Sequence, residues 1–272
     1  MANTITLISD LGSADGQVGQ IKSVIAEFAP LANIVDLTHD VTPFATNEAS
    51  YVLARSVDFL QPGIVMCMVD PHDGRPVIVE VGDGQSYLVG PDNGVMAAAV
   101  ALVGGATNAF EIEFDSSVGV SKSRDIMAPV VAKLAAGTPA NELGKQIDSS
   151  TLVPQLMPVA EIREDGSVDA QVLWIDRFGN IHLNLEGEHV AKLGATVEVT
   201  VDKSSSVMKA VNAISELAEG EVGVLPNSSG LVSIAALRAN AAEIAGILVG
   251  AHVQIAAATL ESGSSTHVEI KQ

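Results

Sequence analysis

The chain has 272 residues, of which 47% are hydrophobic and 3% aromatic, and its 14 basic and 33 acidic residues give a formal net charge of −19. This length suffices for one large domain or two ordinary ones, and an aliphatic, aromatic-poor composition favours layered α/β packing. The negative charge excludes nucleic acids and anionic membrane surfaces as partners, because both would be repelled. It favours a small cationic ligand, although most of these charges can equally form a solubilising surface.

The single cysteine and the apolar segments predict the compartment. Cys67 lies in an apolar run from Gly63 to Val69, which predicts a buried thiol without a disulfide partner, as in a reducing cytoplasm. The N-terminus lacks the basic stretch and apolar core of a signal peptide. The longest weakly polar stretch, Gly94 to Ala106, is too short to span a bilayer. We therefore expect a soluble cytoplasmic protein.

The first half alternates short β-branched runs with apolar residues at helical spacing. This rhythm predicts an α/β domain over residues 1–155, with a mostly parallel, helix-covered, Rossmann-like sheet. The expected strands are Thr4 to Ile8, Asn33 to Leu37, Gly63 to Val69, Val77 to Val81 and Tyr87 to Val89, and the expected helices are Val18 to Phe28, Thr46 to Asp58, Gly94 to Val103 and Asp125 to Ala136.

The second half reads differently, because strand patterns dominate it. Pro154 and Pro158 mark a linker, which we place at residues 156–167. We expect a mainly antiparallel β-barrel domain over residues 168–272, interrupted by one helix from Val207 to Ala218. The expected strands are Asp169 to Ile175, Asn180 to Leu185, Thr196 to Val201, Glu221 to Leu225, Gly230 to Ala235 and His252 to Ile255.

Several expected strands of the first half end in aspartate, namely Asp10, Asp36, Asp70 and Asp92. Ligands of open α/β sheets bind beyond the carboxyl ends of the strands, so these residues predict a site there. The alternative is that each aspartate only forms a turn or caps a helix.

The loop after the first strand, Ser9 to Gln17, has neither a Walker lysine nor a complete G-x-G-x-x-G fingerprint. A phosphate cradle is therefore not expected. The carboxylates of Asp10 and Asp15 suit a ligand with hydroxyl groups and positive charge, because an ionised carboxylate only accepts hydrogen bonds.

A series of motifs then becomes specific when it is taken in chain order over nearly the whole sequence. It resembles the S-adenosyl-L-methionine hydroxide adenosyltransferase family, which is related to the fluorinase and chlorinase. The resemblance implies attack of water on the ribose C5′ carbon of S-adenosyl-L-methionine, releasing adenosine and methionine without a cofactor or a metal. The motifs are Ile34-Val35-Asp36-Leu37-Thr38-His39, Val69-Asp70-Pro71-His72-Asp73-Gly74-Arg75, Pro91-Asp92-Asn93-Gly94, Ser123-Arg124-Asp125, Ile175-Asp176-Arg177-Phe178-Gly179-Asn180 and Asn227-Ser228-Ser229-Gly230.

The resemblance also implies a homotrimer, with the substrate between the N-terminal domain of one subunit and the C-terminal domain of its neighbour. The substrate-binding roles it implies fit the chemistry of the side chains, since carboxylates suit an ammonium and an aromatic face suits a sulfonium. Asp10 would hold the ribose diol, Phe44 would lie near the ribose, Asp15 and Asp176 would meet the amino group, Phe178 and Asn180 would contact the adenosyl portion, and Ser228 would lie near the methionine carboxylate.

In the hydrolytic members of the family an aspartate, an arginine and a histidine surround the water, and Asp70 and Arg75 match the first two. Lys122 stands where the histidine is expected. A protonated lysine cannot act as a base, but as a cation Lys122 could help Arg75 to favour hydroxide. A second hypothesis is that His72 supplies the displaced imidazole.

Three alternatives remain open. Ser123 matches a serine at the halide site of the fluorinase and raises halogenation, against which the carboxylates of Asp70 and Asp73 would repel a halide. Because the histidine is replaced, a second alternative is a non-catalytic protein that binds S-adenosyl-L-methionine. A divalent-metal hydrolase would take its ligands from Asp10, Asp36, His39, Asp40, Asp70, His72 and Asp73.

Overall fold

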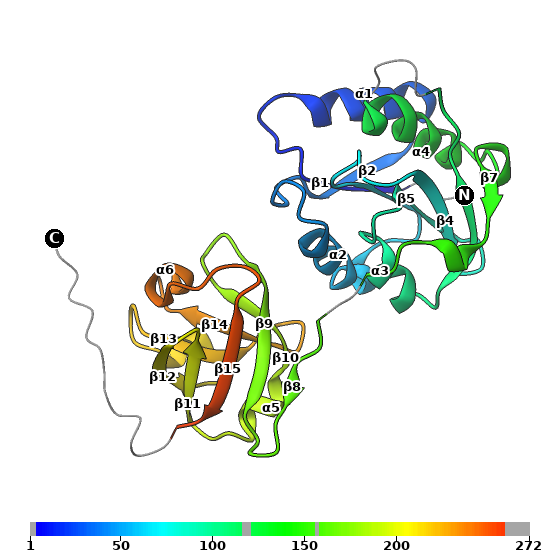
Figure 1. Cartoon of the computed structure of the whole chain (residues 1–272). Coiled ribbons are helices and arrows are strands. Elements are labelled where there is room, and N and C mark those ends of the chain that lie inside the picture. Colours follow the sequence, from blue (N-terminus) through cyan, green and yellow to red (C-terminus); the bar gives the residue numbers. More distant parts are fainter. Residues whose placement is uncertain (1–3, 116–120, 156–157, 259–272) are drawn as a thin grey trace. The chain divides into compact units, whose positions relative to one another are not determined.

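The computed structural model describes residues 4–115, 121–155 and 158–258, and it divides into two compact units, Met1–Leu156 and Met157–Gln272 (Figure 1). Residues 156 and 157 of the expected linker, and 259–272 of the expected C-terminal domain, lie outside the described residues. In the described part of the chain, no helix has the length and apolar character that crossing a membrane requires.

The first unit is built on a seven-stranded sheet of order β2-β1-β3-β5-β4-β6-β7. The β1–β2, β1–β3 and β3–β5 pairs are parallel, whereas β4–β5, β4–β6 and β6–β7 are antiparallel. The α/β class is confirmed, but the sheet is parallel only in its first half. The strands are β1 (Thr4–Ser9), β2 (Asn33–Thr38), β3 (Ile64–Met68), β4 (Pro76–Val81), β5 (Ser86–Pro91), β6 (Ala106–Glu111) and β7 (Lys145–Ile147).

The turn between β4 and β5 explains why the sheet changes direction. Gly82, Asp83 and Gly84 all have positive φ angles, of 59°, 54° and 80°. Such residues form tight hairpin turns, and a hairpin pairs its strands antiparallel. The Gly-Asp-Gly sequence between two apolar runs is the local signal for this reversal.

Helices cover both faces of the sheet (Figure 1). On one face α1 (Gln17–Phe28) and α4 (Ala128–Ala135) pack on β1 and β3, while α2 (Thr46–Ala54) and α3 (Ala97–Leu102) pack on the other face. Cys67 is completely buried in this second layer, as expected, and burial raises the pKa of its thiol to about 12.

Three expected helices of the first unit differ in detail from the structure, and the one expected from Gly94 begins at Ala97 as α3. The first three residues of the helix expected from Asp125 belong to a π-helical turn, η2 (Lys122–Met127), which leads directly into α4. The helix expected to run to Asp58 ends at Ala54 and is followed by the 3-10 turn η1 (Val57–Phe59). Two further 3-10 turns are η3 (Ala140–Glu142) and η4 (Ser149–Thr151).

The second unit is a β-barrel, as expected, and seven strands close it, one more than the sequence predicts. The strand order is β10-β14-β13-β12-β11-β15-β9-β8, and the pairing of β9 with β10 closes the barrel and leaves β8 outside it. The strands are β8 (Glu161–Ile162), β9 (Val168–Ile175), β10 (Ile181–Glu186), β11 (Thr196–Val201), β12 (Ser204–Ala210), β13 (Val222–Pro226), β14 (Leu231–Ala236) and β15 (His252–Ala257).

The helix expected from Val207 to Ala218 is wrong. Residues 204–210 form β12, which pairs antiparallel with β11, and only the 3-10 turn η5 (Ile214–Glu216) follows. Pairing with β11 satisfies the backbone of this segment, so tertiary context overrides a local apolar spacing that resembles a helix. The described residues of this unit form two short α-helices, α5 (Gly187–Ala191) and α6 (Ala241–Ala245).

Candidate active site

The carboxyl ends of β1, β3 and β5 meet at one edge of the sheet, because these three neighbouring strands run parallel. Asp10 directly follows β1, Asp70 follows β3 by one residue, and Asp92 directly follows β5. Asp36 differs from the expectation, because β2 continues past it to Thr38. The sheet therefore gathers three of the four expected aspartates.

Asp10 fixes two separate loops with one carboxylate oxygen. Its Oδ2 accepts the backbone N–H of Phe44 at 2.9 Å and that of Asp70 at 3.2 Å. Both donors have positive φ angles, 65° for Phe44 and 44° for Asp70, which are uncommon for residues with a side chain. The Phe44 side chain is 73% exposed and available to a ligand. This carboxylate thus stabilises a backbone geometry that is unfavourable for residues with a side chain.

The turn from Asp70 to Arg75 is held by its neighbours. Asn93 Nδ2 donates to the carbonyls of Val69 and Asp70, at 3.2 and 3.4 Å. Gly74 has φ 84° and lies so close to the backbone of Asp92 that a Cβ would be 2.5 Å from its carbonyl oxygen. Only glycine fits there, which places the turn firmly against the end of β5.

Lys122, the residue in the position of the expected histidine, contacts this same turn. Its Nζ donates to the backbone carbonyls of Gly74 at 3.0 Å and His72 at 3.3 Å. The side chain therefore anchors the turn from the direction of η2. His72, the alternative imidazole, is exposed.

The guanidinium of Arg75 donates hydrogen bonds to three side chains of the same chain. Nε donates to Asp92 at 3.0 Å, Nη1 to Glu111 at 3.2 Å and Nη2 to Thr151 at 3.0 Å. Burial opposes its charge, but the hydrogen bonds and negative charges of Asp92 and Glu111 raise the pKa of Arg75. Asp92 also accepts the backbone N–H of Val153 at 2.8 Å, so its carboxylate joins Arg75 to the segment at Val153.

Ser123 and Asp15 complete the expected residues of this unit. Ser123 is only 2% exposed, and its hydroxyl has no hydrogen-bond partner among the described residues. A buried unpartnered hydroxyl costs about 1–3 kcal/mol, which a bound ligand or water would offset. Asp15 is exposed, and hydrogen bonds from the side chain and backbone of Gln17 lower its pKa.

In the second unit, Asp176 organises a compact turn after β9. Its Oδ1 accepts the backbone N–H of Phe178 at 2.9 Å and of Asn180 at 3.0 Å. Its Oδ2 accepts Asn180 Nδ2 at 2.9 Å and contacts His182 Nε2 at 3.3 Å. Burial raises the pKa of Asp176, but the hydrogen bonds from Asn180, Phe178 and His182 outweigh it and lower the pKa below 3.8. The turn presents Phe178 with its side chain 70% exposed.

Ser228 is exposed in the turn between β13 and β14. Its neighbour Asn227 shapes this turn, since Asn227 Oδ1 accepts the backbone N–H of Ser229 at 2.9 Å and Leu231 at 3.2 Å. Asn227 Nδ2 reaches His182 Nδ1 at 3.3 Å, and His182 in turn contacts Asp176. The structure therefore links the two expected substrate-binding turns of this unit through a histidine.

Sequence reasoning missed His182 and its partners Trp174 and Ser233. All three are buried, and they lie inside strands. A signal was present, because His182 and Ser233 are polar residues within otherwise apolar strand patterns, and polar residues at such positions require partners.

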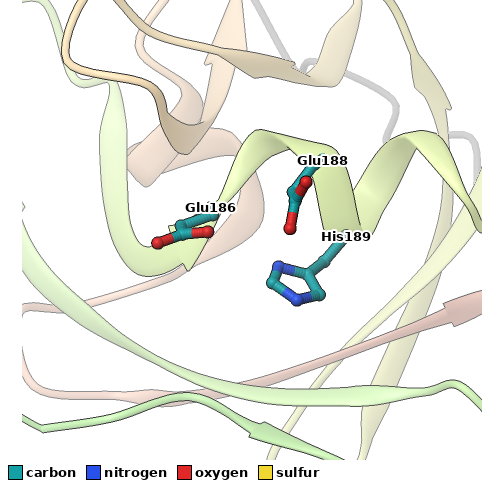
Figure 2. Close-up of side chains that lie close together, drawn as sticks. All are labelled: Glu186, Glu188 and His189. Atoms are coloured by element: carbon teal, nitrogen blue, oxygen red, sulfur yellow. The ribbon is translucent and has the colours of Figure 1, made fainter.

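The described residues also contain a possible metal-ligand set outside these turns. Glu186, Glu188 and His189 offer one atom each within 4.8 Å of one another (Figure 2). Both carboxylates are exposed, and Glu188 lies 4.0 Å from Lys192 Nζ. The aspartates and histidines of the metal-hydrolase alternative form no such set within the described ranges. His39, for example, is occupied by Ser9 at 2.7 Å and Asp36 at 3.1 Å.

Known proteins match this chain along most of its length. A model of the S-adenosyl-L-methionine hydroxide adenosyltransferase N-terminal domain matches residues 5–144, and that of the C-terminal domain matches residues 170–254. An (R)-S-adenosyl-L-methionine hydrolase of Salinispora tropica is 34% identical over 261 residues, covering 93% of this chain and 97% of that protein. A fluorinase of Actinopolyspora mzabensis is 26% identical over 221 residues, covering 70% and 74% of the two chains.

A solved structure agrees with these matches. The crystal structure of a conserved protein from Thermotoga maritima superposes with a TM-score of 0.81 at 28% identity, covering 93% of this chain and 99% of that one. Both units of the fold and their strand-end motifs are thus accounted for by one family. The chain belongs to the S-adenosyl-L-methionine hydroxide adenosyltransferase family.

Proposed function

We propose that this chain hydrolyses S-adenosyl-L-methionine to adenosine and L-methionine. The observation that carries the proposal is the Asp10 carboxylate, which holds Phe44 and Asp70 in left-handed backbone conformations at the carboxyl ends of parallel strands. Asp10 Oδ1 has no partner among the described residues, so a ribose diol can donate to it. Membership of the family supports the same substrate.

The chemistry requires positioning rather than acid catalysis. A water oxygen forms a bond to C5′ while the C5′–S bond breaks, and the bonding electron pair leaves on sulfur as a neutral thioether. The water loses one proton, and a carboxylate within hydrogen-bond reach assists this loss. We assign this role to Asp70, with Arg75 and Lys122 holding the turn that carries it and His72 as a further candidate. Orienting and desolvating the water supplies the rest of the acceleration.

The remaining assignments are part of the proposal. Asp15 and Asp176 meet the substrate amino group, and Ser228 lies near its carboxylate. Phe178 and Asn180 contact the adenosyl portion, and Ser123 supplies a hydroxyl near the attacking water. The two sets of residues lie in different units, so we propose a homotrimer with shared sites, acting in the cytoplasm without cofactor or metal.

The test is incubation of the purified protein with S-adenosyl-L-methionine, with and without chloride, followed by chromatography and mass detection of the nucleoside. We expect adenosine at a rate independent of chloride. Asp70→Asn is the matched control, because asparagine tolerates a positive φ and removes only the charge. It should lower kcat about 100-fold, as expected when a general base is lost.

The other outcomes are equally informative. A 5′-halogenated nucleoside would establish the halogenase alternative, and bound but intact substrate would establish a binding protein. Loss of hydrolysis in a chelator would revive the metal hydrolase.

A further inference from the structure

His182 lies at the centre of a buried hydrogen-bond chain in the barrel. His182 lies on β10, opposite Trp174 of the neighbouring strand β9 and opposite Ser233 of the other neighbouring strand, β14. Its ring stacks on Trp174, with centroids 3.8 Å apart and an interplanar angle of 4°. Its Nδ1 is 2.8 Å from Ser233 Oγ, and its Nε2 is 3.3 Å from Asp176 Oδ2. The ring is therefore held by contacts on its face and on both nitrogens.

The direction of every hydrogen bond in this chain follows from Asn227. Asn227 Oδ1 accepts two backbone N–H groups, so Nδ2 must be the donor that faces His182 Nδ1 and Ser233 Oγ. Ser233 Oγ, which accepts from Asn227 at 3.1 Å, then donates its own hydrogen to His182 Nδ1. His182 carries its proton on Nε2 and donates it to Asp176. Donation in this series of hydrogen bonds therefore runs in one direction, from Asn227 to Asp176.

Serine, histidine and aspartate in contact also form hydrolase triads, but this arrangement cannot act as one. Ser233 is 3% exposed and lies in the middle of β14. Its hydroxyl is enclosed by Asn227 and the histidine ring, and a nucleophile must reach its substrate. The hydrogen-bonded residues Asn227, Ser233, His182 and Asp176 therefore position the two turns and do not catalyse a reaction.

We propose that His182 is a positioning residue that sets the specificity for the amino-acid end of the substrate. It connects the Asp176 turn to the Asn227–Gly230 turn through hydrogen bonds on its two ring nitrogens. This inference rests on the proposed function, in which Asp176 meets the amino group and Ser228 lies near the carboxylate. These two groups share one carbon atom, so the turns that bind them must keep a fixed separation. His182 provides that fixed separation.

The test compares binding of S-adenosyl-L-methionine and adenosine, which lacks the methionine half. His182→Phe keeps a ring for the Trp174 stack and removes the hydrogen bonds on both ring nitrogens, to Asp176, Asn227 and Ser233. Asp176 keeps its other three hydrogen bonds in this variant, so the Phe178–Asn180 turn stays in place. We expect affinity for S-adenosyl-L-methionine, measured by calorimetry, to fall about tenfold, with adenosine affinity unchanged. KM should rise by the same factor, and kcat should stay near the wild-type value.

Two further variants complete the experiment. His182→Gln retains an N–H donor for Asp176, so it should recover part of the lost affinity, and it serves as the test if the phenylalanine variant does not fold. His252→Phe is the control for histidine replacement in the same barrel, since His252 is exposed, and it should change neither affinity.

Equal losses for both ligands, or no loss for either, would overturn the role of His182 even while the wild type hydrolyses its substrate. Wild-type binding without turnover would overturn the proposed hydrolysis and leave the comparison of the two ligands intact. A wild type that does not bind S-adenosyl-L-methionine would refute both.

Discussion

Two aspartates that directly follow strands, one in each unit, organise their surroundings over very different distances along the chain. Asp10 accepts backbone N–H groups from residues 34 and 60 positions further on. Asp176 accepts from residues two, four and six positions further on. The surroundings of Asp10 are thus assembled by the sheet, and those of Asp176 by the local sequence.

This difference predicts what each unit loses when its aspartate is changed. Without Asp10, two loops lose a shared acceptor and two residues at positive φ lose the contact that holds them there. Without Asp176, a turn loses local hydrogen bonds while the barrel strands around it keep their pairing. We expect replacement of Asp10 to disturb distant loops of its unit. Replacement of Asp176 should disturb only its own turn.

The largest expected effect is that of Asp10→Ala. Two backbone N–H groups lose their acceptor, and because these groups are exposed or partly buried each lost hydrogen bond costs about 0.5–1.5 kcal/mol. Displacement of Phe44 and Asp70 should lower kcat/KM by more than about 100-fold. Steady-state kinetics and urea unfolding measure the two effects. Asp10→Asn is the control, because an amide oxygen still accepts both N–H groups, so its stability should stay near wild type. An alanine variant with wild-type stability would contradict this account.

An intermediate effect is expected at Lys122. Lys122→Met removes both hydrogen bonds to the carbonyls of His72 and Gly74 and frees the turn that carries Asp70. We expect kcat to fall about tenfold with KM nearly unchanged, because the turn is displaced by less than when Asp10 is lost. Lys122→Arg retains a cation with N–H donors and should keep most of the activity. If arginine and methionine are equally inactive, Lys122 takes a direct part in the chemistry.

The smallest effect concerns acid stability and sharpens the contrast from the side of Asp176. Its folded-state pKa lies below the ordinary 3.8, so its ionised form contributes stability that is fully present above that value. The contribution is lost as the pH falls through the folded-state pKa. In Asp176→Asn, an amide NH2 faces the donors Asn180 Nδ2 and His182 Nε2, which should cost about 1–2 kcal/mol at neutral pH.

Urea unfolding of wild type and Asp176→Asn between about pH 7 and about pH 2 measures this contribution. The difference in unfolding free energy should shrink as the solution is acidified. The other carboxylates with lowered pKa values, such as Asp125 and Asp165, are common to both proteins and cancel. A difference that does not change with pH would show that the charge of Asp176 contributes nothing to folding.

The sequence predicts those parts of the fold that local patterns encode. Apolar periodicity identified the α/β and β-barrel classes, and the strand-end aspartates located the edge where Asp10, Asp70 and Asp92 meet. The helix predicted for residues 207–218 is wrong, because the sequence of this segment does not show that β12 pairs with β11. Apolar periodicity does not predict the antiparallel half of the first sheet, because the Gly82–Gly84 hairpin turn sets the direction of β4 relative to β5.

The same distinction applies to the site. Asp176, Phe178 and Asn180 belong to one short motif, and the structure brings them together. The contact of Lys122 with the turn at residues 72–74 joins segments 48 and 50 positions apart, and no local pattern indicates it. His182 of β10 has its partners on β9 and β14, so its contacts exist only in the closed barrel.

The burial of Cys67 gives the folded chain a practical property. Because Cys67 is the single cysteine and lies completely buried on β3 in the apolar cluster with α2 and α3, thiol reagents have no target until the first unit opens. The rate of labelling therefore serves as a clock for that opening. A cysteine introduced at an exposed position of the barrel, such as Lys192, would add a fast-reacting tag against which the slow reaction of Cys67 is timed.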